Sequence, residues 1–148
     1  MKDIIVRRAT YTDKPEWLRM RQALWPDHSA EEFALQSDEI LNDPMQPVFV
    51  VERPDGKLAG LLEAGTRKYA EGCDSSPVGY IEGWYVDEDL RKQGIGKSLV
   101  QAAEEWARSQ SLIEIASDTW LDNEVSIQAH LKVGYEEAER LVHFMKKL

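Results

Sequence analysis

The pattern of apolar and polar positions changes its period several times along the chain. Apolar residues that recur every three or four positions indicate amphipathic helices, and short runs rich in Val, Ile and aromatic residues indicate strands. On this basis the predicted helices cover residues 14–25, 29–41, 94–108 and 123–132. The predicted strands cover residues 4–8, 48–52, 58–64, 80–86, 112–118, 135–139 and 141–147.

Boundary signals support several of these elements. Asp13 is a candidate cap for the first helix. Ser29 and Glu32 have the spacing of a capping box at the start of the second helix. Gly134 is placed to end the last helix, and the polar stretch at residues 67–79 is predicted as a loop between two strands.

The predicted order of elements is β-α-α-β-β-β-α-β-α-β-β. The strand at 80–86, the helix at 94–108 and the strand at 112–118 form a parallel βαβ unit with a right-handed crossover. The other strands can pair antiparallel, so we predict an α/β fold with one mixed sheet and helices on both faces. Since the 148 residues contain no linker or repeat, residues 1–148 are predicted to form a single domain.

The charge of the chain narrows the possible ligands. The formal net charge is −9 at pH 7. This argues against nucleic acid as a partner, because phosphate binding needs clustered Lys and Arg. An acidic surface attracts cations, although a charge of this size can also serve solubility alone. Both interpretations stay open at this point.

No stretch indicates a membrane protein, an exported protein or a metal site. The longest apolar run, at 48–51, is far shorter than the roughly 20 residues that a membrane-spanning helix needs. The N-terminus lacks an apolar signal-peptide core, so we expect a cytoplasmic protein. Cys73 is the single cysteine and has no disulfide partner. No metal is expected, because His28, His130 and His143 lack metal-ligand spacing.

Residues 91–100, RKQGIGKSLV, look like a phosphate-binding loop that opens a helix. A Walker A loop would need Gly where the chain has Arg91, and a dinucleotide fingerprint would need Gly where it has Leu99. The remaining pattern is R/Q-x-x-G-x-G, whose glycines let the backbone turn while free N–H groups at the helix start bind an anion. The alternative is an ordinary strand-to-helix turn with capping glycines.

This loop resembles the signature of the GCN5-related N-acetyltransferase (GNAT) superfamily. IEGWYVDEDLR before the loop and LDNEVSIQAHLKVGY after it carry the same resemblance. The resemblance implies acetyl-CoA as cosubstrate, with its pyrophosphate at the loop and its pantetheine arm along a strand that is splayed from its parallel neighbour. The cofactor-binding residues it implies are Trp84, Tyr85, Val86, Arg91, Lys92, Gln93, Gly94, Ile95, Gly96, Lys97 and Asn123.

Nearly the whole chain also resembles one branch of this superfamily, the bacterial aminoglycoside 6'-N-acetyltransferases. The stretches that carry this resemblance are LRMRQALWPDHS, YAEGCDSSPVGYIEGWYV, EIASDTWLDNEVS and GYEEAERLVHF. It implies acetylation of the 6'-amine of aminoglycoside antibiotics, which confers resistance, and a homodimer. The acceptor-site residues it implies are Trp25, His28, Tyr69, Glu82, Asp118 and Glu139.

The residue types suit such an acceptor. An aminoglycoside is polycationic, so carboxylates and an aromatic wall would bind it. The net charge of −9 would then attract this substrate in addition to keeping the protein soluble. Glu82 lies in mid-strand, where a charge needs a reason. Each residue also has a structural alternative: an ion pair within the sheet for Glu82, a turn cap for Asp118, core packing for Trp25, and plain surface exposure for His28, Tyr69 and Glu139.

The superfamily usually transfers the acetyl group directly in a ternary complex. We assign Asp118 as the base that takes a proton from the acceptor ammonium, and Glu82 as the group that orients it. A backbone N–H near Val86 would polarise the thioester carbonyl. The general acid for the leaving thiolate stays unassigned, because no Tyr closely follows Asn123. Cys73 is a weak candidate nucleophile, since no His adjoins it.

Two other functions remain possible on the sequence alone. A GNAT enzyme for another amine, such as a polyamine or a peptide N-terminus, would share the loop and differ in its acceptor site. A non-catalytic CoA-binding domain would keep the fold without the chemistry, and the presence of both Glu82 and Asp118 counts against it.

Overall fold

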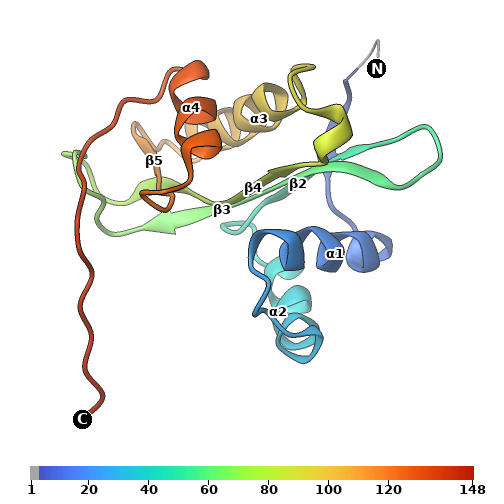
Figure 1. Cartoon of the computed structure of the whole chain (residues 1–148), viewed down its shortest axis with the longest axis horizontal. Coiled ribbons are helices and arrows are strands. Elements are labelled where there is room, and N and C mark those ends of the chain that lie inside the picture. The colour runs from blue at the N-terminus through green and yellow to red at the C-terminus, as the bar shows by residue number, and fades with distance from the viewer. Residues whose placement is uncertain (1–3) are drawn as a thin grey trace.

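Five strands form one mixed sheet in the order β1-β2-β3-β4-β5 in a computed structural model that describes residues 4–148 (Figure 1). The first three pairings are antiparallel, and β4 and β5 run parallel. The predicted α/β fold class with a mixed sheet is therefore confirmed. The strands are β1 (Val6–Arg8), β2 (Val48–Glu52), β3 (Leu58–Arg67), β4 (Val78–Val86) and β5 (Ile115–Ser117).

The helices cover both faces of this sheet, with α1 and α2 on one side and α3 and α4 on the other (Figure 1). All four were predicted, with boundaries within a few residues. Among residues 4–148, no helix combines the length and the apolar character needed to cross a membrane. The helices are α1 (Lys14–Leu24), α2 (Ala30–Asn42), α3 (Ile95–Ser109) and α4 (Glu124–Lys132), with short 3-10 turns at Tyr11–Asp13 and Glu88–Leu90.

β3 is buried along most of its length because helices pack on both of its sides. Leu61 packs with Trp17 and Phe33 on the side of α1 and α2. Its neighbour Leu62 points the other way and packs with Leu99 of α3. Successive side chains of a strand face opposite ways, so a strand covered on both faces needs a continuous apolar run.

The two predicted helix caps have different outcomes. Ser29 is confirmed as the N-cap of α2, since its Oγ accepts a hydrogen bond from the backbone N–H of Glu32 at 3.1 Å. Asp13 makes no side-chain cap bond to α1. Its carboxylate instead accepts from the guanidinium of Arg7, at 2.7 and 2.9 Å, and from the N–H of Thr10. Asp13 therefore joins the 3-10 turn to β1.

β4 and β5 are splayed, as predicted. Their pairing covers only three positions, from Gly79 opposite Ile115 to Ile81 opposite Ser117. Beyond Ile81, β4 continues to Val86, and no strand within residues 4–148 pairs with it on that side. A slot therefore opens between the carboxyl ends of the two parallel strands.

A β-bulge lies on β4 at the start of this slot. On β3, Glu63 pairs with Gly83 while the next residue, Ala64, pairs with Ile81. Glu82 is thus an extra residue without a partner across the ladder, and a bulge turns its side chain away from the regular alternation. This explains how an exposed charge sits inside a strand that is otherwise mostly apolar.

The two closing strands predicted at residues 135–139 and 141–147 are wrong. Tyr135 is held by a hydrogen bond from its hydroxyl to Glu104, at 2.9 Å. From there, residues 136–148 form an extended C-terminal arm that leaves the body of the molecule (Figure 1). Within residues 4–148, no backbone hydrogen bond joins this arm to a strand. A strand-forming sequence makes a strand only where a neighbouring edge is within reach.

Candidate active site

The start of α3 offers a set of backbone donors to an anion. Gly94, the N-cap, has φ of +87°, a conformation that favours glycine. The next three amides, of residues 95–97, are in the first turn of the helix and have no partner within it. No side chain caps them. The cationic side chains of Arg91, Lys92 and Lys97 belong to the same short segment, so the site suits a phosphate group.

Trp84 of β4 packs tightly against the start of α3. A Cβ on Gly96 would lie 3.1 Å from the ring of Trp84, so any larger residue would have to push the indole slightly away from the loop. Within the described chain, the indole N–H of Trp84 is buried and lacks a partner. Because this N–H is buried, a ligand in the slot does not reach it in this structure.

The end of β4 is tied to the loop by Arg91. Its Nε donates to the carbonyl oxygen of Val86 at 3.0 Å, and its guanidinium lies 5.9 Å from the ring of Tyr85. The amide of Asp87 donates to the carbonyl of Ala59 on β3. Because successive amides of a strand point to opposite sides, the N–H of Val86 points away from β3 and toward the slot.

Asn123 is the N-cap of α4, and its side-chain oxygen accepts from the N–H of Ser126 at 3.1 Å. The capping role considered for it is confirmed, and a contact with a ligand stays a prediction. His130, later on the same helix, is locked in place rather than free. Its Nδ1 donates to the carbonyl of Ser126, and its Nε2 meets the hydroxyl of Ser117 at 2.8 Å.

A cluster of polar side chains stands where β3, β4 and β5 meet the slot. Arg67 binds Glu82 with two donors, Nη2 at 2.7 Å and Nε at 3.1 Å. The same guanidinium lies 3.6 Å from the centroid of the Tyr80 ring. The hydroxyl of Tyr80 donates to Asp118. Three strands thus connect Glu82 and Asp118, the two predicted catalytic carboxylates, through Arg67 and Tyr80.

The protonation states in this cluster have clear causes. Burial and the hydrogen bond to Asp118 raise the pKa of the Tyr80 hydroxyl, which therefore stays protonated and donates. The hydrogen bonds to Glu82 raise the pKa of Arg67, which keeps its charge. Asp118 consequently accepts from a protonated hydroxyl, and Glu82 is paired with a charged guanidinium.

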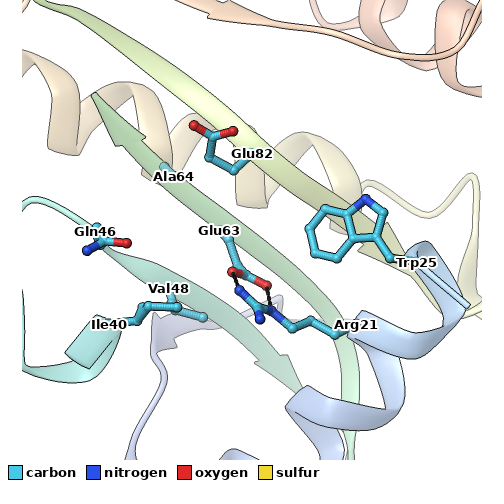
Figure 2. Close-up of a pocket in the computed structure, with 8 residues that line it drawn as sticks. All are labelled: Arg21, Trp25, Ile40, Gln46, Val48, Glu63, Ala64 and Glu82. Atoms are coloured by element: carbon cyan, nitrogen blue, oxygen red, sulfur yellow. Dashed lines mark hydrogen bonds and ion pairs between the residues drawn. The ribbon is translucent and has the colours of Figure 1, made fainter. Parts of the chain in front are cut away.

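A pocket of about 260 Å³ lies between the sheet and the first two helices, with Glu82 among its lining residues (Figure 2). Its floor is a buried ion pair in which Arg21 binds Glu63 at 2.7 and 2.8 Å. The indole N–H of Trp17 also donates to Glu63. The lining residues are Arg21, Trp25, Ile40, Gln46, Val48, Glu63, Ala64 and Glu82.

Trp25 and His28 are held next to each other by Arg21 and Gly83. The ring of Trp25 lies directly over Gly83, where a Cβ would come within 2.8 Å of its edge. Arg21 makes a hydrogen bond to Nε2 of His28 at 2.9 Å. Since a guanidinium can only donate, Nε2 accepts and the ring proton is on Nδ1, which faces Glu32 at 3.6 Å.

Two predicted acceptor residues are not brought into this group by a single chain. Tyr69 is 67% exposed in the loop after β3. Glu139 lies exposed on the C-terminal arm. The remaining four, Trp25, His28, Glu82 and Asp118, gather around the pocket and the cluster beside it.

Sequence reasoning missed Arg21, Glu63, Arg67 and Tyr80. Glu63 is the only charge within LAGLLEAG, a signal of the same kind as the one that marked Glu82. Arg21 carried no comparable signal, because a charge on a helix is ordinary until its partner is known. The candidate nucleophile Cys73 is disfavoured, since burial and the charge of Glu114 raise the pKa of its thiol. Within residues 4–148, no group of His, Cys, Asp and Glu could hold a metal.

Comparisons with known proteins agree with this geometry. Residues 15–135 match the model of the "Acetyltransferase (GNAT) family". The chain is 42% identical to an aminoglycoside N(6')-acetyltransferase type 1 of Klebsiella aerogenes over 147 residues, 97% of each chain. It is 39% identical to the enzyme of that name from Serratia marcescens, over 89% of this chain and 91% of that one.

Solved structures show the same fold. AAC(6')-Iy, in complex with the bisubstrate analogue CoA-S-monomethyl-acetylneamine, superposes with a TM-score of 0.92 at 33% identity over 99% of both chains. The aminoglycoside 6'-N-acetyltransferase AAC(6')-Ih of Acinetobacter baumannii also gives a TM-score of 0.92, at 31% identity and 99% coverage of both chains.

Proposed function

Because the chain belongs to the GNAT acetyltransferase family, and within it to the aminoglycoside N(6')-acetyltransferases, we propose that it transfers the acetyl group of acetyl-CoA to the 6'-amine of aminoglycosides. Acetylation removes a charge and a donor from the antibiotic, so the activity confers resistance. The observation that carries the proposal is the pair of carboxylates, Glu82 and Asp118, beside the slot between splayed β4 and β5.

The cosubstrate half of the site uses mainly backbone groups. Acetyl-CoA supplies an activated acyl group as a thioester. The amides of residues 95–97, with Arg91, Lys92 and Lys97, bind its pyrophosphate. The segment Trp84 to Val86 lies along its pantetheine arm, and the end of the β4–β5 pairing at Ile81 supports this. The loop itself is shaped by Gln93, Gly94, Ile95 and Gly96. Asn123, the N-cap of α4, contacts the pantetheine arm of CoA.

The acceptor half uses side chains. A polycationic sugar enters over Trp25 and His28, with Tyr69 and Glu139 as further contacts at the rim. Glu82 binds and orients its 6'-ammonium, and Asp118 takes one proton from it. All of these roles are part of the proposal, which is supported by the presence of Trp25 and Glu82 in the lining of the pocket.

The transfer itself is direct. The neutral amine nitrogen attacks the thioester carbonyl, a C–N bond forms, and the C–S bond breaks to release CoA. The nitrogen loses its second proton in this step, and the leaving sulfur takes that proton directly or through water, so that the products are the amide and the CoA thiol. The N–H of Val86, which points into the slot, donates to the carbonyl oxygen as negative charge develops on it. The protein supplies position and electrostatics, and no acyl-enzyme is needed.

The test is release of CoA from acetyl-CoA with three acceptors offered separately. These are tobramycin, an aminoglycoside with a 6'-hydroxyl in place of the 6'-amine, and spermidine. Turnover with tobramycin alone is expected. Turnover with spermidine but with neither sugar would show that the acceptor is a polyamine rather than an antibiotic. Tight binding of acetyl-CoA without any turnover would indicate a non-catalytic CoA-binding domain.

We propose that two copies form a homodimer through the C-terminal arm. The apolar side chains of the arm are exposed in the single chain, and Phe144 is 86% exposed. β5 pairs with a strand on one side only, so its outer edge can accept a strand from another chain. Glu139, on the same arm, would then be carried toward a neighbouring copy. The exposed apolar residues of the arm are Leu141, Val142, Phe144, Met145 and Leu148.

The dimer is tested by analytical ultracentrifugation. The wild type should sediment as a dimer, and the double substitution Val142→Glu, Phe144→Glu should give a monomer. Leu35→Glu is the control, because Leu35 is 77% exposed on α2, away from the arm. A monomeric wild type at micromolar concentration would contradict the proposal.

We further propose that the protein works in the cytoplasm. Acetyl-CoA is made and used there, and the one cysteine, Cys73, is a free thiol, as is common in a reducing compartment. Fractionation of cells that express the tagged protein should recover it with cytoplasmic markers. Recovery with periplasmic markers would overturn this assignment.

A further inference from the structure

Arg67 binds the carboxylate of Glu82, the group that binds the acceptor ammonium in the proposed mechanism. Both oxygens of Glu82 accept from its guanidinium, at 2.7 and 3.1 Å. The guanidinium also lies 3.6 Å from the Tyr80 ring centroid, and the charge of Asp118 adds to what raises its pKa. A cation of the protein itself thus stands where the ammonium of a substrate has to bind.

This ion pair differs from the other arginine–glutamate pair nearby. The side chains of Arg21 and Glu63 are 8% and 7% exposed, and removing one partner would leave a buried charge. The side chains of Arg67 and Glu82 are 44% and 38% exposed. Water can replace the contacts of an exposed pair at little cost, so this pair can open while the buried one cannot.

We infer that Arg67 is an internal counter-cation that holds Glu82 until the ammonium group of the acceptor displaces it, and that it thereby determines which acceptors bind. The inference rests on the proposed function and adds a specificity-determining residue to it. When the pair opens, the guanidinium keeps its stacking on Tyr80, so the displaced side chain has a place to stay.

The competition has two consequences. The apparent affinity for any acceptor is lowered by the fraction of molecules in which Glu82 is free. A polycationic acceptor offsets this loss with several ammonium groups, whereas a monocationic amine has only one. Arg67 therefore selects for polycations within an acidic site that would otherwise bind many amines.

The experiment compares Arg67→Gln with Arg67→Lys and with Arg7→Gln. Arg7 is the control for net charge, because it also binds a carboxylate with two donors, on the edge strand β1 and two strands away from β3. Arg7→Gln and Arg67→Gln change the net charge equally. Circular dichroism and thermal unfolding confirm that each variant folds before steady-state constants are measured with tobramycin and with a monocationic amino sugar.

Arg67→Gln is expected to lower the KM for tobramycin about tenfold while kcat stays within about twofold, and to make the monocationic sugar a measurable substrate. The Kd for tobramycin, measured by calorimetry without acetyl-CoA, should fall in parallel. Arg67→Lys should lie between the wild type and Arg67→Gln, because lysine keeps the charge but makes neither the two-donor contact nor the stacking. Arg7→Gln should stay near the wild type. A merely structural Arg67 would instead raise the KM or lower kcat.

An unchanged or raised KM in Arg67→Gln, with a wild type that acetylates tobramycin, would overturn the inference and leave the proposed function standing. An equal fall of the KM in Arg7→Gln would overturn it as well, since net charge alone would then explain the effect. A wild type that acetylates no aminoglycoside would overturn the proposed function and the inference together.

Discussion

The two halves of the site are built in different ways. The half assigned to acetyl-CoA comes mostly from one contiguous segment, residues 84–97, and its donors are largely backbone amides. The half assigned to the acceptor comes from α1, β3, β4 and the end of β5, and its working groups are side chains. Its contacts join residues far apart in the sequence, such as Arg21 with Glu63 and Tyr80 with Asp118.

This difference determines which substitutions each half of the site tolerates. Backbone donors do not depend on side-chain identity, except where a side chain would block the loop or strain it. Side-chain contacts fail one at a time, because each depends on a particular pair. The two halves should therefore respond to substitution independently, and each experiment below asks whether a change in one half leaves the other intact.

The largest difference between the responses of the two halves is expected from Asp118→Asn. An amide cannot take the proton from the acceptor ammonium, so kcat should fall about a thousandfold. The Kd for acetyl-CoA should stay unchanged, because Asp118 lies outside the loop. Steady-state kinetics and calorimetry give the two values. Asp122→Asn, in the same connection before α4, serves as the control. If the kcat of Asp118→Asn stayed within tenfold of the wild type, Asp118 would not be the base.

Glu63→Gln is expected to act on stability. It leaves Arg21 with an uncompensated buried charge, and the free energy of unfolding should fall by about 3 kcal/mol. The KM for tobramycin should rise as well, since Arg21 positions His28. Urea unfolding followed by fluorescence measures the first effect. The control is Glu52→Gln, an exposed partner of Arg7, which should cost less than about 1 kcal/mol. Equal losses in both variants would contradict the distinction.

Gly94→Val is directed at the other half. A β-branched residue at φ of +87° strains the backbone by about 1–2 kcal/mol and moves the amides that follow. The Kd for acetyl-CoA should weaken about tenfold, while tobramycin binding to the free enzyme stays the same. Gly56→Val is a matched control, because Gly56 has φ of +89° in a turn with open space around it. It should lose similar stability and no acetyl-CoA affinity.

The smallest effect is expected from Tyr80→Phe. Loss of the hydrogen bond to Asp118 should lower kcat about fivefold, which corresponds to about 1 kcal/mol. The pKa of Tyr80 is raised above its ordinary value of about 10, so the hydroxyl remains protonated and the loss should be constant from about pH 6 to 9. A pH–rate profile checks this. Tyr135→Phe, which loses a bond to Glu104 on α3, should leave kcat unchanged.

The same difference explains how far the sequence could be interpreted. The loop and α3 were predicted closely because glycines and helical periodicity are local signals. Arg67 was missed because the predicted strand stopped at residue 64 and the chain after it was assigned to a loop, whereas β3 runs to Arg67. Arg21 and Glu63 lie 42 positions apart, so their pairing follows from the packing of α1 on the sheet rather than from any local pattern.

The C-terminal arm shows the opposite error. Its apolar residues predicted strands, and this sequence does favour an extended conformation locally. A strand also needs a neighbour, and in the described part of a single chain the arm has none. The proposed homodimer would supply this neighbour from a second copy.

The position of Trp25 has a thermodynamic consequence. Its ring is seated on Gly83 and lies 5.7 Å from the guanidinium of Arg21, so it is already ordered before any sugar arrives. Immobilising a side chain on binding costs about 0.5–1.5 kcal/mol, and a ring that is already fixed avoids that cost. The aromatic wall proposed for the acceptor site is therefore preorganised. Acceptor binding should then show a smaller entropic penalty than in Gly83→Ala, where an added Cβ would unseat the ring.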